Sequence, residues 1–496
     1  MHDRLEDDKR ILTVTAGNLR QNHLYISKHL DFLPKDCIGP ARRAGQVVRQ
    51  IEIELDGLAK TIATDIGMDA KTGKPRRFIR DRAWIGKFFK HHKVQEGARL
   101  VLSRLTPRRF RLSIDLESLD LHRQLRAVEF FAGIGLVRLA LEENGTKVVY
   151  ANDINADKQE LYEANFPPGE FCLGDIHDVH ATDIPDADLF TASFPCTDLS
   201  IAGAMRGIHS GESSTFWELV RILKEAGDRR PQAVLLENVP GFLMSHEGND
   251  FAGAVSALNE LGYACDAVFL NASRFVPQSR LRLFVIGRLG AEASNPFGLQ
   301  SSKIRPPVLT DFILSHPELG WDIEDLPDPP DLHPVLAAII EDLPDNHEEW
   351  WNPKRTEYFM NQLSEKHGRA ADEMIAGRNV SYATAFRRIR HGRSMAELRT
   401  DGIAGCLRTP RGGSGRQILF KAGKGRYQVR LLTPRECARL QGVPDAYHVG
   451  TSRNKALFGF GDAVCVPAIS WVIEHCLLPG ISREPVSTAI RRTGTQ

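Results

Sequence analysis

The sequence predicts an open, doubly wound α/β sheet, preceded by a small β-rich domain and interrupted by a smaller, mostly irregular region. Two observations predict the sheet. Short apolar runs alternate with segments of helical spacing between residues 125 and 290, and the helical pattern returns between 426 and 480. A third predicts the N-terminal domain, because its apolar runs are short, often alternate with polar residues and are separated by Gly, Pro, Asn and Asp.

These patterns divide the chain of 496 residues into five parts. We expect residues 1–124 to form the β-rich basic domain and residues 125–290 the main part of the α/β domain. Residues 291–425 are rich in Pro, Gly, Arg and His and form the irregular region. Residues 426–480 return to the α/β domain, and the polar residues 481–496 form a flexible tail.

The main domain begins with a buried strand at 127–131, a glycine-rich turn and a helix at 136–143. Open sheets of this kind bind ligands beyond the carboxyl ends of their strands. Further strands are predicted at 148–151, 189–193, 233–236, 267–270 and 283–286, and helices at 214–226 and 251–261.

The net charge of +1 says little about partners, but the distribution of charge says more. From Lys71 to Arg111, fourteen Lys or Arg side chains stand against two acidic ones, an excess that suits phosphate groups. A solvated basic face on a stabilising or oligomerising appendage explains the same composition, and both interpretations stay open. The basic, aromatic end of the domain resembles the DNA-binding pseudobarrels of plant transcription factors and some restriction enzymes, through Arg80, Arg82, Trp84, Phe88 and Phe89.

The eight cysteines are scattered and contain no CxxC pair, so neither a zinc ribbon nor a thioredoxin-type site is indicated. No metal site is expected. The chain opens without an apolar signal region and contains no run of about 18 apolar residues. We expect a cytoplasmic protein, independent of membranes, with reduced thiols.

A glycine-rich turn at Phe131-Ala132-Gly133-Ile134-Gly135 follows the first strand. Its glycines allow a tight turn and a close approach of the backbone to a ligand. A nicotinamide site begins in the same way. However, the third glycine of that pattern would fall at Arg138, and the rest of the chain supplies no hydride-transfer chemistry.

Reactive side chains occupy three further segments. A cysteine such as Cys196 is nucleophilic near neutral pH and can leave again. Glu237 follows an apolar strand, and burial favours its protonated, donating form. Arg280 and Arg282 share one side of a strand and can hold an oxygen atom or a phosphate. The segments are Phe194-Pro195-Cys196-Thr197, Glu237-Asn238-Val239 and Gln278-Ser279-Arg280-Leu281-Arg282.

Each segment alone has an ordinary structural explanation, but their order is informative. From Arg126 to about Cys476 the chain resembles the DNA (cytosine-5) methyltransferase family of bacterial restriction–modification type. The resemblance implies a Rossmann-like, S-adenosyl-L-methionine-dependent fold. It also implies methyl transfer to carbon 5 of a cytosine at a specific sequence in duplex DNA, through a covalent Cys–cytosine intermediate. A stacked base cannot reach these groups, so base flipping is implied too.

By this resemblance, the catalytic residues are Cys196 as the nucleophile, Glu237 as the acid at ring nitrogen 3, and Arg280 and Arg282 as supports of the base and the acid. Residues 291–425 would recognise the target, and the block Arg430–Gly442 would organise that region. The expected DNA-binding residues are Thr197, Ser200, Gln278, Arg408, Arg411 and Arg416.

The resemblance also places the cofactor. Asp153 would accept hydrogen bonds from the ribose, Asp175 would bind the adenine amino group, and Ile154 and Ile176 would pack on the adenine faces. The expected cofactor-binding residues are Phe131, Ala132, Gly133, Ile134, Gly135, Asp153, Ile154, Asp175, Ile176, Pro195, Ala463 and Val464.

Three positions depart from the family's usual pattern. Leu136 stands where a third small residue is frequent, and Thr197 where Gln commonly follows the catalytic Cys. Asp462 stands where Asn is usual, and a carboxylate can accept hydrogen bonds but cannot donate them as Asn does.

The sequence therefore predicts a monomeric DNA (cytosine-5-)-methyltransferase that acts on double-stranded DNA, with any cognate restriction endonuclease acting independently. One alternative is an RNA cytosine-5 methyltransferase, and the long recognition region and the N-terminal domain favour DNA over it. Another is a DNA-binding regulator that has lost catalysis, and the intact Cys196, Glu237, Arg280 and Arg282 argue against it.

Overall fold

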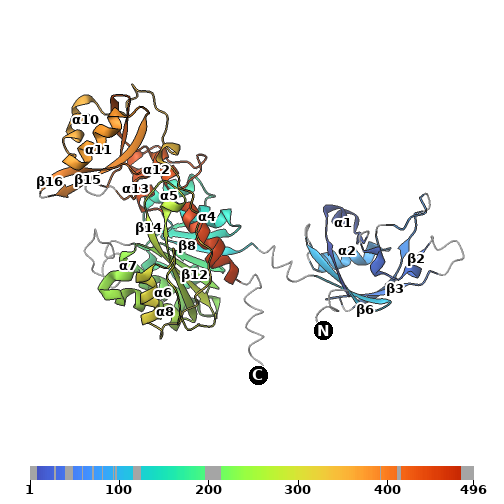
Figure 1. The fold of residues 1–496 in the computed structure, drawn as a ribbon. Coiled ribbons are helices and arrows are strands. Elements are labelled where there is room, and N and C mark those ends of the chain that lie inside the picture. The colour runs from blue at the N-terminus through green and yellow to red at the C-terminus, as the bar shows by residue number, and fades with distance from the viewer. Residues whose placement is uncertain are drawn as a thin grey trace. The chain divides into compact units, whose positions relative to one another are not determined.

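The structure is a computed structural model. Its contacts divide the chain into two compact units, one built on residues 1–123 and one on residues 124–482 (Figure 1). It describes residues 8–26, 29–39, 48–58, 60–69, 72–76, 78–80, 82–92, 94, 98–114, 124–195, 214–390, 392–409 and 415–481.

The larger unit is built on a seven-stranded sheet in the order β10-β9-β8-β11-β12-β14-β13. Strand β14 is antiparallel to both of its neighbours, and the other strands run in one direction. This topology confirms the predicted open, mostly parallel, doubly wound sheet. The strands are β8 (Arg126–Phe130), β9 (Lys147–Asp153), β10 (Phe171–Leu173), β11 (Leu189–Ala192), β12 (Ala233–Asn238), β13 (Tyr263–Asn271) and β14 (Leu281–Leu289).

Helices cover both faces of this sheet, because its strands are apolar on both sides. Ala127 and Leu235 point into one hydrophobic layer, and the next residues along their strands, Val128 and Leu236, point into the other. The first layer packs against α4 (Leu136–Glu143), α5 (Ala156–Glu163) and α14 (Val466–Val472). The second packs against α6 (Thr215–Ala226), α7 (Gly241–Met244), α8 (Asn249–Glu260) and α9 (Pro307–Ser315).

The reversed direction of β14 positions the site. Because β14 is antiparallel, it begins at the edge where the parallel strands end. Its register with β12 pairs Glu237 with Phe284 and Asn238 with Leu283. The residues before β14 therefore meet the ends of β8, β9, β11 and β12 at one edge of the sheet.

The segment 291–425 is more regular than predicted. It contains most of a four-stranded antiparallel sheet in the order β16-β15-β17-β18, packed against two helices. Many inward side chains of the sheet are small, such as Ala383, Ala385 and Ala396, and they pack in one cluster with Phe359. Alanine gives little hydrophobic contrast, so the alternation was weak in the sequence. The elements are α10 (Pro353–Met360), α11 (Glu365–Ala376), β15 (Ser381–Arg390), β16 (Arg393–Arg399), β17 (Ile418–Gly423) and β18 (Arg426–Leu431).

The chain then returns to the main sheet through α12 (Pro434–Leu440) and α13 (Arg453–Asp462). Thr433 and Glu436 form a capping box at the start of α12, with Pro434 in the first turn. Among the described residues, one helical stretch, 453–480, has the length and apolar composition to cross a membrane. Its most apolar part is 67% buried inside the protein, as in the core helix of a globular domain.

The smaller unit is mostly β-structure. Its main sheet has the order β1-β6-β7-β3-β4, and β2 pairs with β5. Trp84, Phe88 and Phe89, which carry part of the resemblance to DNA-binding pseudobarrels, are buried in its core. The elements are β1 (Lys9–Thr13), α1 (Ala16–Gln21), β2 (Ile38–Gly39), β3 (Ile51–Leu55), β4 (Lys60–Thr64), β5 (Ile66–Gly67), α2 (Arg82–His91), β6 (Arg99–Thr106) and β7 (Arg109–Ile114).

One buried ion pair fixes the return of the chain, and it yields a stability prediction. Arg430 and Glu436 are both fully buried, and Arg430 Nη1 donates to Glu436 Oε2 at 2.6 Å. Glu436→Ala leaves an unpaired buried guanidinium, so we expect it to lower the free energy of unfolding by about 3–5 kcal/mol.

Arg439→Ala on the same helix is the matched control. Arg439 pairs with Asp445 at the surface, and such pairs are worth about 1 kcal/mol or less. Urea unfolding followed by tryptophan fluorescence measures both variants, because five of the six Trp residues lie within residues 124–482. An equal decrease in the free energy of unfolding of the two variants would contradict the prediction.

Candidate active site

The glycine-rich turn after β8 has a strained backbone that leaves space beside it. Phe131 and Gly133 have φ angles of 55° and 59°. The nearest atom to a Cβ added at Gly133 is a backbone oxygen 3.9 Å away, whereas a Cβ at Gly135 would lie 2.3 Å from the Phe166 ring. Gly135 is therefore needed for packing, and Gly133 keeps an open cradle at the end of β8.

Asp153 lies next to this cradle, at the end of β9. The carboxylate is nearly buried and accepts hydrogen bonds from the backbone N–H of Gly133 and of Asn155, each at 2.9 Å. The following side chain, Ile154, is 68% exposed although it is large and apolar. A polar acceptor, an open glycine and an exposed apolar side chain together fit a ribose and an adenine ring.

Asp175 and Ile176 follow β10 and differ in their exposure to a ligand at the surface. Asp175 accepts hydrogen bonds from the backbone and the imidazole of His177, and these bonds lower the pKa of its carboxyl group. Ile176 is almost fully buried against the helix layer that contains α6. Asp175 is accessible to a ligand, whereas Ile176 offers it little surface.

A buried carboxyl group lies behind the turn. Glu129 on β8 is fully buried, and neither of its oxygens has a hydrogen-bond partner of good geometry. Burial raises the pKa of Glu129 to about 8, and the nearby guanidinium of Arg138 offsets this only in part.

The end of β11 carries the Phe-Pro-Cys segment. Phe194 packs between the rings of Phe216 and Phe242, and its carbonyl accepts a hydrogen bond from the Asn238 side chain at 3.2 Å. Pro195 is the last described residue of the segment. The expected nucleophile Cys196 lies outside the described residues, as do Thr197, Ser200 and Arg411.

Glu237 and the two arginines come together at the same edge. Arg282 Nε lies 2.9 Å from Glu237 Oε1, and Glu237 is 7% exposed. Arg280 is buried and donates from Nη1 to the Leu407 carbonyl at 3.0 Å. An acidic group and two guanidiniums therefore converge close to Phe194-Pro195.

Gln278 does not have the role expected from the sequence. Its side chain is fully buried, donates to the carbonyl of Leu440 at 2.7 Å and accepts from the backbone N–H of Leu407 at 2.9 Å. No surface remains for DNA, so Gln278 is corrected to a structural residue. Its partner Gln441 donates to the carbonyl of Ala463, which fixes the expected cofactor segment at the end of α13, and Val464 is buried there.

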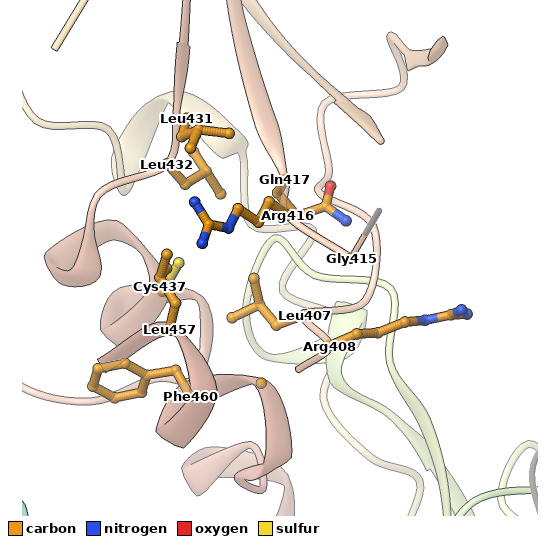
Figure 2. Close-up of a pocket in the computed structure, with 11 residues that line it drawn as sticks. Leu407, Arg408, Gly415, Arg416, Gln417, Leu431, Leu432, Cys437, Leu457 and Phe460 are labelled. Atoms are coloured by element: carbon orange, nitrogen blue, oxygen red, sulfur yellow. The ribbon is translucent and has the colours of Figure 1, made fainter. Parts of the chain in front are cut away.

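The arginines expected to recognise DNA differ in their surroundings. Arg408 is exposed, and Figure 2 shows its side chain extending away from a small pocket. Arg416 reaches over the apolar lining of this pocket, beside Leu432 and Cys437, and donates to Asn454 at 3.1 Å. Leu407 lines the pocket with its side chain and binds Arg280 with its carbonyl. The pocket therefore lies next to Arg280 at the edge of the main sheet.

The sequence did not indicate the contact between Cys406 and Arg280. Its sulfur lies 3.4 Å from Nη1 of Arg280. Burial raises the pKa of the Cys406 thiol, but the guanidiniums of Arg280, Arg282 and Arg408 outweigh burial and leave the pKa below its usual value. The contact joins residues 126 positions apart, so no local pattern could have indicated it.

A second missed feature is a cluster of cations at the base of the four-stranded sheet. The guanidinium of Arg355 lies 4.1 Å from the ring centre of Trp351, and that of Arg387 lies 5.6 Å from it. The guanidiniums of Arg387, Arg453 and Arg416, added to burial, lower the pKa of Arg355. The guanidiniums in this cluster outnumber the carboxylates beside them, so the cluster carries a net positive charge that can attract a polyanion.

Within the described ranges, no group of three or more His, Cys, Asp and Glu side chains could hold a metal ion.

Comparisons with known proteins find relatives of most of this chain. A family model described as C-5 cytosine-specific DNA methylase matches residues 125–477. Type II methyltransferase M.HhaI of Haemophilus parahaemolyticus is 32% identical over 355 residues, which cover 70% of this chain and 93% of that protein. Type II methyltransferase M.DsaV of Dactylococcopsis salina is 29% identical over 360 residues, 72% of this chain and 86% of that protein. The crystal structure of S. pombe Dnmt2 methyltransferase covers 72% of this chain and 99% of its own, at 20% identity and a TM-score of 0.49.

The buried Glu129 yields a pH prediction. In the unfolded chain its carboxyl group loses its proton near pH 4.5, but in the folded protein it keeps the proton up to about pH 8. Between these values the folded state binds more protons, so this group makes stability fall as pH rises, by up to about 1.4 kcal/mol per pH unit.

Glu129→Gln cannot titrate, so we expect the variant to gain stability relative to the wild type as the pH rises from 5 to 8. Urea midpoints at pH 5, 6.5 and 8 measure this difference. If the urea midpoints of the two proteins changed by the same amount between these pH values, Glu129 would not hold a proton in the folded state.

Proposed function

Because the chain belongs to the C-5 cytosine-specific DNA methylase family, we propose a specific role for each residue gathered at the sheet edge. The protein is a DNA (cytosine-5-)-methyltransferase, uses S-adenosyl-L-methionine as methyl donor and acts on DNA. The observation that carries the proposal is the convergence of Glu237, Arg282 and Arg280 close to Phe194-Pro195.

The cofactor would occupy the cradle beside β8 and β9. Gly133 leaves room for it, Asp153 would accept hydrogen bonds from the ribose hydroxyls, and the exposed Ile154 would pack on the adenine. Asp175 would bind the adenine amino group. The remaining contacts would come from Phe131, Ala132, Ile134, Gly135, Ile176, Pro195, Ala463 and Val464. When bound, S-adenosyl-L-methionine supplies an electrophilic methyl group.

Cys196 would act as the nucleophile. Carbon 5 of cytosine is a weak nucleophile until the thiolate of Cys196 adds to carbon 6, which leaves carbon 5 electron-rich. After methyl transfer, loss of the proton on carbon 5 expels the thiolate and restores the ring. Cysteine suits both steps, because it is a strong nucleophile and a good leaving group.

Glu237 would protonate ring nitrogen 3 as the thiolate adds, a contribution of roughly 100- to 10,000-fold for general acid catalysis. The ion pair with Arg282 orients its carboxyl group. Arg282 would also bind the cytosine carbonyl oxygen. Arg280 is held by the Leu407 carbonyl, so it would help to keep Arg282 in position.

A cytosine in a duplex must leave the stack to reach these groups, so the reaction requires base flipping. Residues 291–425 would select the sequence, with Arg408, Arg411 and Arg416 reaching DNA and with Thr197 and Ser200 near the flipped base. The cationic cluster of Arg355 and Arg387 supports this placement, since double-stranded DNA is a polyanion.

We also propose that the protein acts as a monomer in the cytoplasm, as the modification half of a restriction–modification system. A partner endonuclease would act independently of it. We further propose that residues 1–124 form a DNA-binding domain, with 125–290 and 426–480 as the catalytic domain, 291–425 as the recognition domain and 481–496 as a flexible tail.

The nucleophile is tested by a covalent trap. When carbon 5 of the target carries fluorine, the methylated adduct has no proton to lose there, so the thiolate cannot be expelled. We expect DNA containing 5-fluorocytosine at the target site to form a denaturation-resistant complex with the wild type and none with Cys196→Ala. Gel electrophoresis under denaturing conditions detects it.

Bisulfite sequencing of a plasmid from expressing cells defines the target site first. Protected cytosines in one sequence context, absent with Cys196→Ala, are expected. A covalent complex that persists in the Cys196→Ala variant would remove Cys196 from the mechanism.

The N-terminal domain is tested by the salt dependence of DNA binding. Deleting residues 1–123 should weaken DNA binding and flatten the plot of log affinity against log salt, by about 0.9 per lost phosphate contact. In the intact chain, Lys87→Ala with Lys90→Ala should act in the same direction, because both side chains are exposed on α2. Fluorescence anisotropy at several salt concentrations measures both effects, and unchanged slopes would indicate an appendage without DNA contacts.

A further inference from the structure

One lysine joins the two segments that border the cofactor cradle. Lys158 is the third residue of α5, and its Nζ lies 3.2 Å from Asp462 Oδ2 and 3.9 Å from Asp153 Oδ2. Its side chain is 21% exposed, and that of Asp153 is 7% exposed. One ammonium group therefore lies between two carboxylates that are 309 positions apart in the sequence.

The position of Asp462 calls for such a cation. Asp462 is the last residue of α13, where the negative end of the helix dipole disfavours a carboxylate. Asp153 adds a second negative charge nearby. In a partly buried site the repulsion between these charges is stronger than in water, and Lys158 compensates for both.

The orientation of Asp153 is set from three sides. Its Oδ1 accepts from the backbone N–H of Asn155, its Oδ2 accepts from Gly133, and Lys158 approaches Oδ2 from α5. The two backbone donors come from β8 and β9 loops that any side chain at Lys158 would leave in place. Of the three groups, the ammonium is the one that a side-chain substitution removes while the backbone stays unchanged.

We propose that Lys158 is a positioning residue for S-adenosyl-L-methionine. Its ammonium holds the Asp153 carboxylate in the orientation that accepts the ribose hydroxyls, and Asp462 holds the ammonium in place. The inference rests on the proposed role of Asp153 as the ribose acceptor. Since Lys158 acts at the ribose, it serves S-adenosylmethionine and S-adenosylhomocysteine equally.

A second lysine provides a matched control. Lys455 on α13 pairs with Asp157 at 2.8 Å and with Glu160 at 2.6 Å, both on α5. It links the same two helices as Lys158, but its partners are exposed and do not include Asp153. Loss of Lys455 weakens the docking of the helices without touching the ribose acceptor.

The test is calorimetric titration of the full-length protein with S-adenosylmethionine and with S-adenosylhomocysteine. We expect Lys158→Met to raise both dissociation constants by the same factor, about tenfold, and Lys158→Arg to restore most of the affinity. Lys455→Met should lower the melting temperature and leave both constants unchanged. In the Asp153→Ala variant, adding Lys158→Met should not raise either dissociation constant further, because the two residues act through one contact.

The outcomes separate the inference from the function on which it rests. Unchanged affinity in Lys158→Met, unequal losses for the two ligands, or an equal loss in Lys455→Met would overturn the inference and leave the cofactor assignment intact. Unchanged affinity in Asp153→Ala would instead overturn the proposed ribose acceptor, and with it the route by which Lys158 acts. Melting temperatures of all variants confirm that each is folded.

Discussion

The buried side-chain amides of Gln278 and Gln441 hold together the segments that meet at the carboxyl ends of the parallel strands. Gln278 donates to the Leu440 carbonyl and the Gln441 side chain and accepts from the Leu407 backbone, while Gln441 donates to the carbonyls of Phe460 and Ala463. These bonds join the start of β14, the segment after β16, the end of α12 and the end of α13. In a buried site each unmade bond is costly, so the network admits one arrangement of these segments.

The positions of Arg280, Arg282 and Glu237 depend on this junction and on the direction of β14. Arg282 reaches Glu237 because an antiparallel strand begins where its parallel neighbour ends. Arg280 is fixed by the Leu407 carbonyl, and the backbone N–H of the same residue, Leu407, donates to the Gln278 side chain. Glu237 and Arg282 therefore stand on neighbouring, paired strands, which fixes their contact.

Features set by neighbouring residues could be predicted from the sequence, whereas those set by distant contacts could not. The strand and helix around the glycine-rich turn were placed within a residue, because an apolar run and two glycines are local signals. The four-stranded sheet was missed because alanines such as Ala383, Ala385 and Ala396 make up much of its inward face and weaken the alternation. Gln278 was misassigned because a buried amide and a DNA-binding amide look alike in a sequence. The Lys158–Asp462 contact spans the catalytic and return segments, and only the folded chain brings its partners together.

The four-stranded sheet has a hydrophobic core of its own, formed by Phe359, Phe420, Val429 and the inward alanines. It joins the main domain through polar contacts such as those of Arg430 and Arg453, and Leu419 and Tyr382 pack against the main hydrophobic core. The exposed side chains at one end of β15 and β16, at 388–390 and 393–394, contribute to neither core. Over evolutionary time these strands can accept new surface residues while the machinery of methyl transfer stays under constant selection, so sequence preference and chemistry can diverge at different rates within one gene.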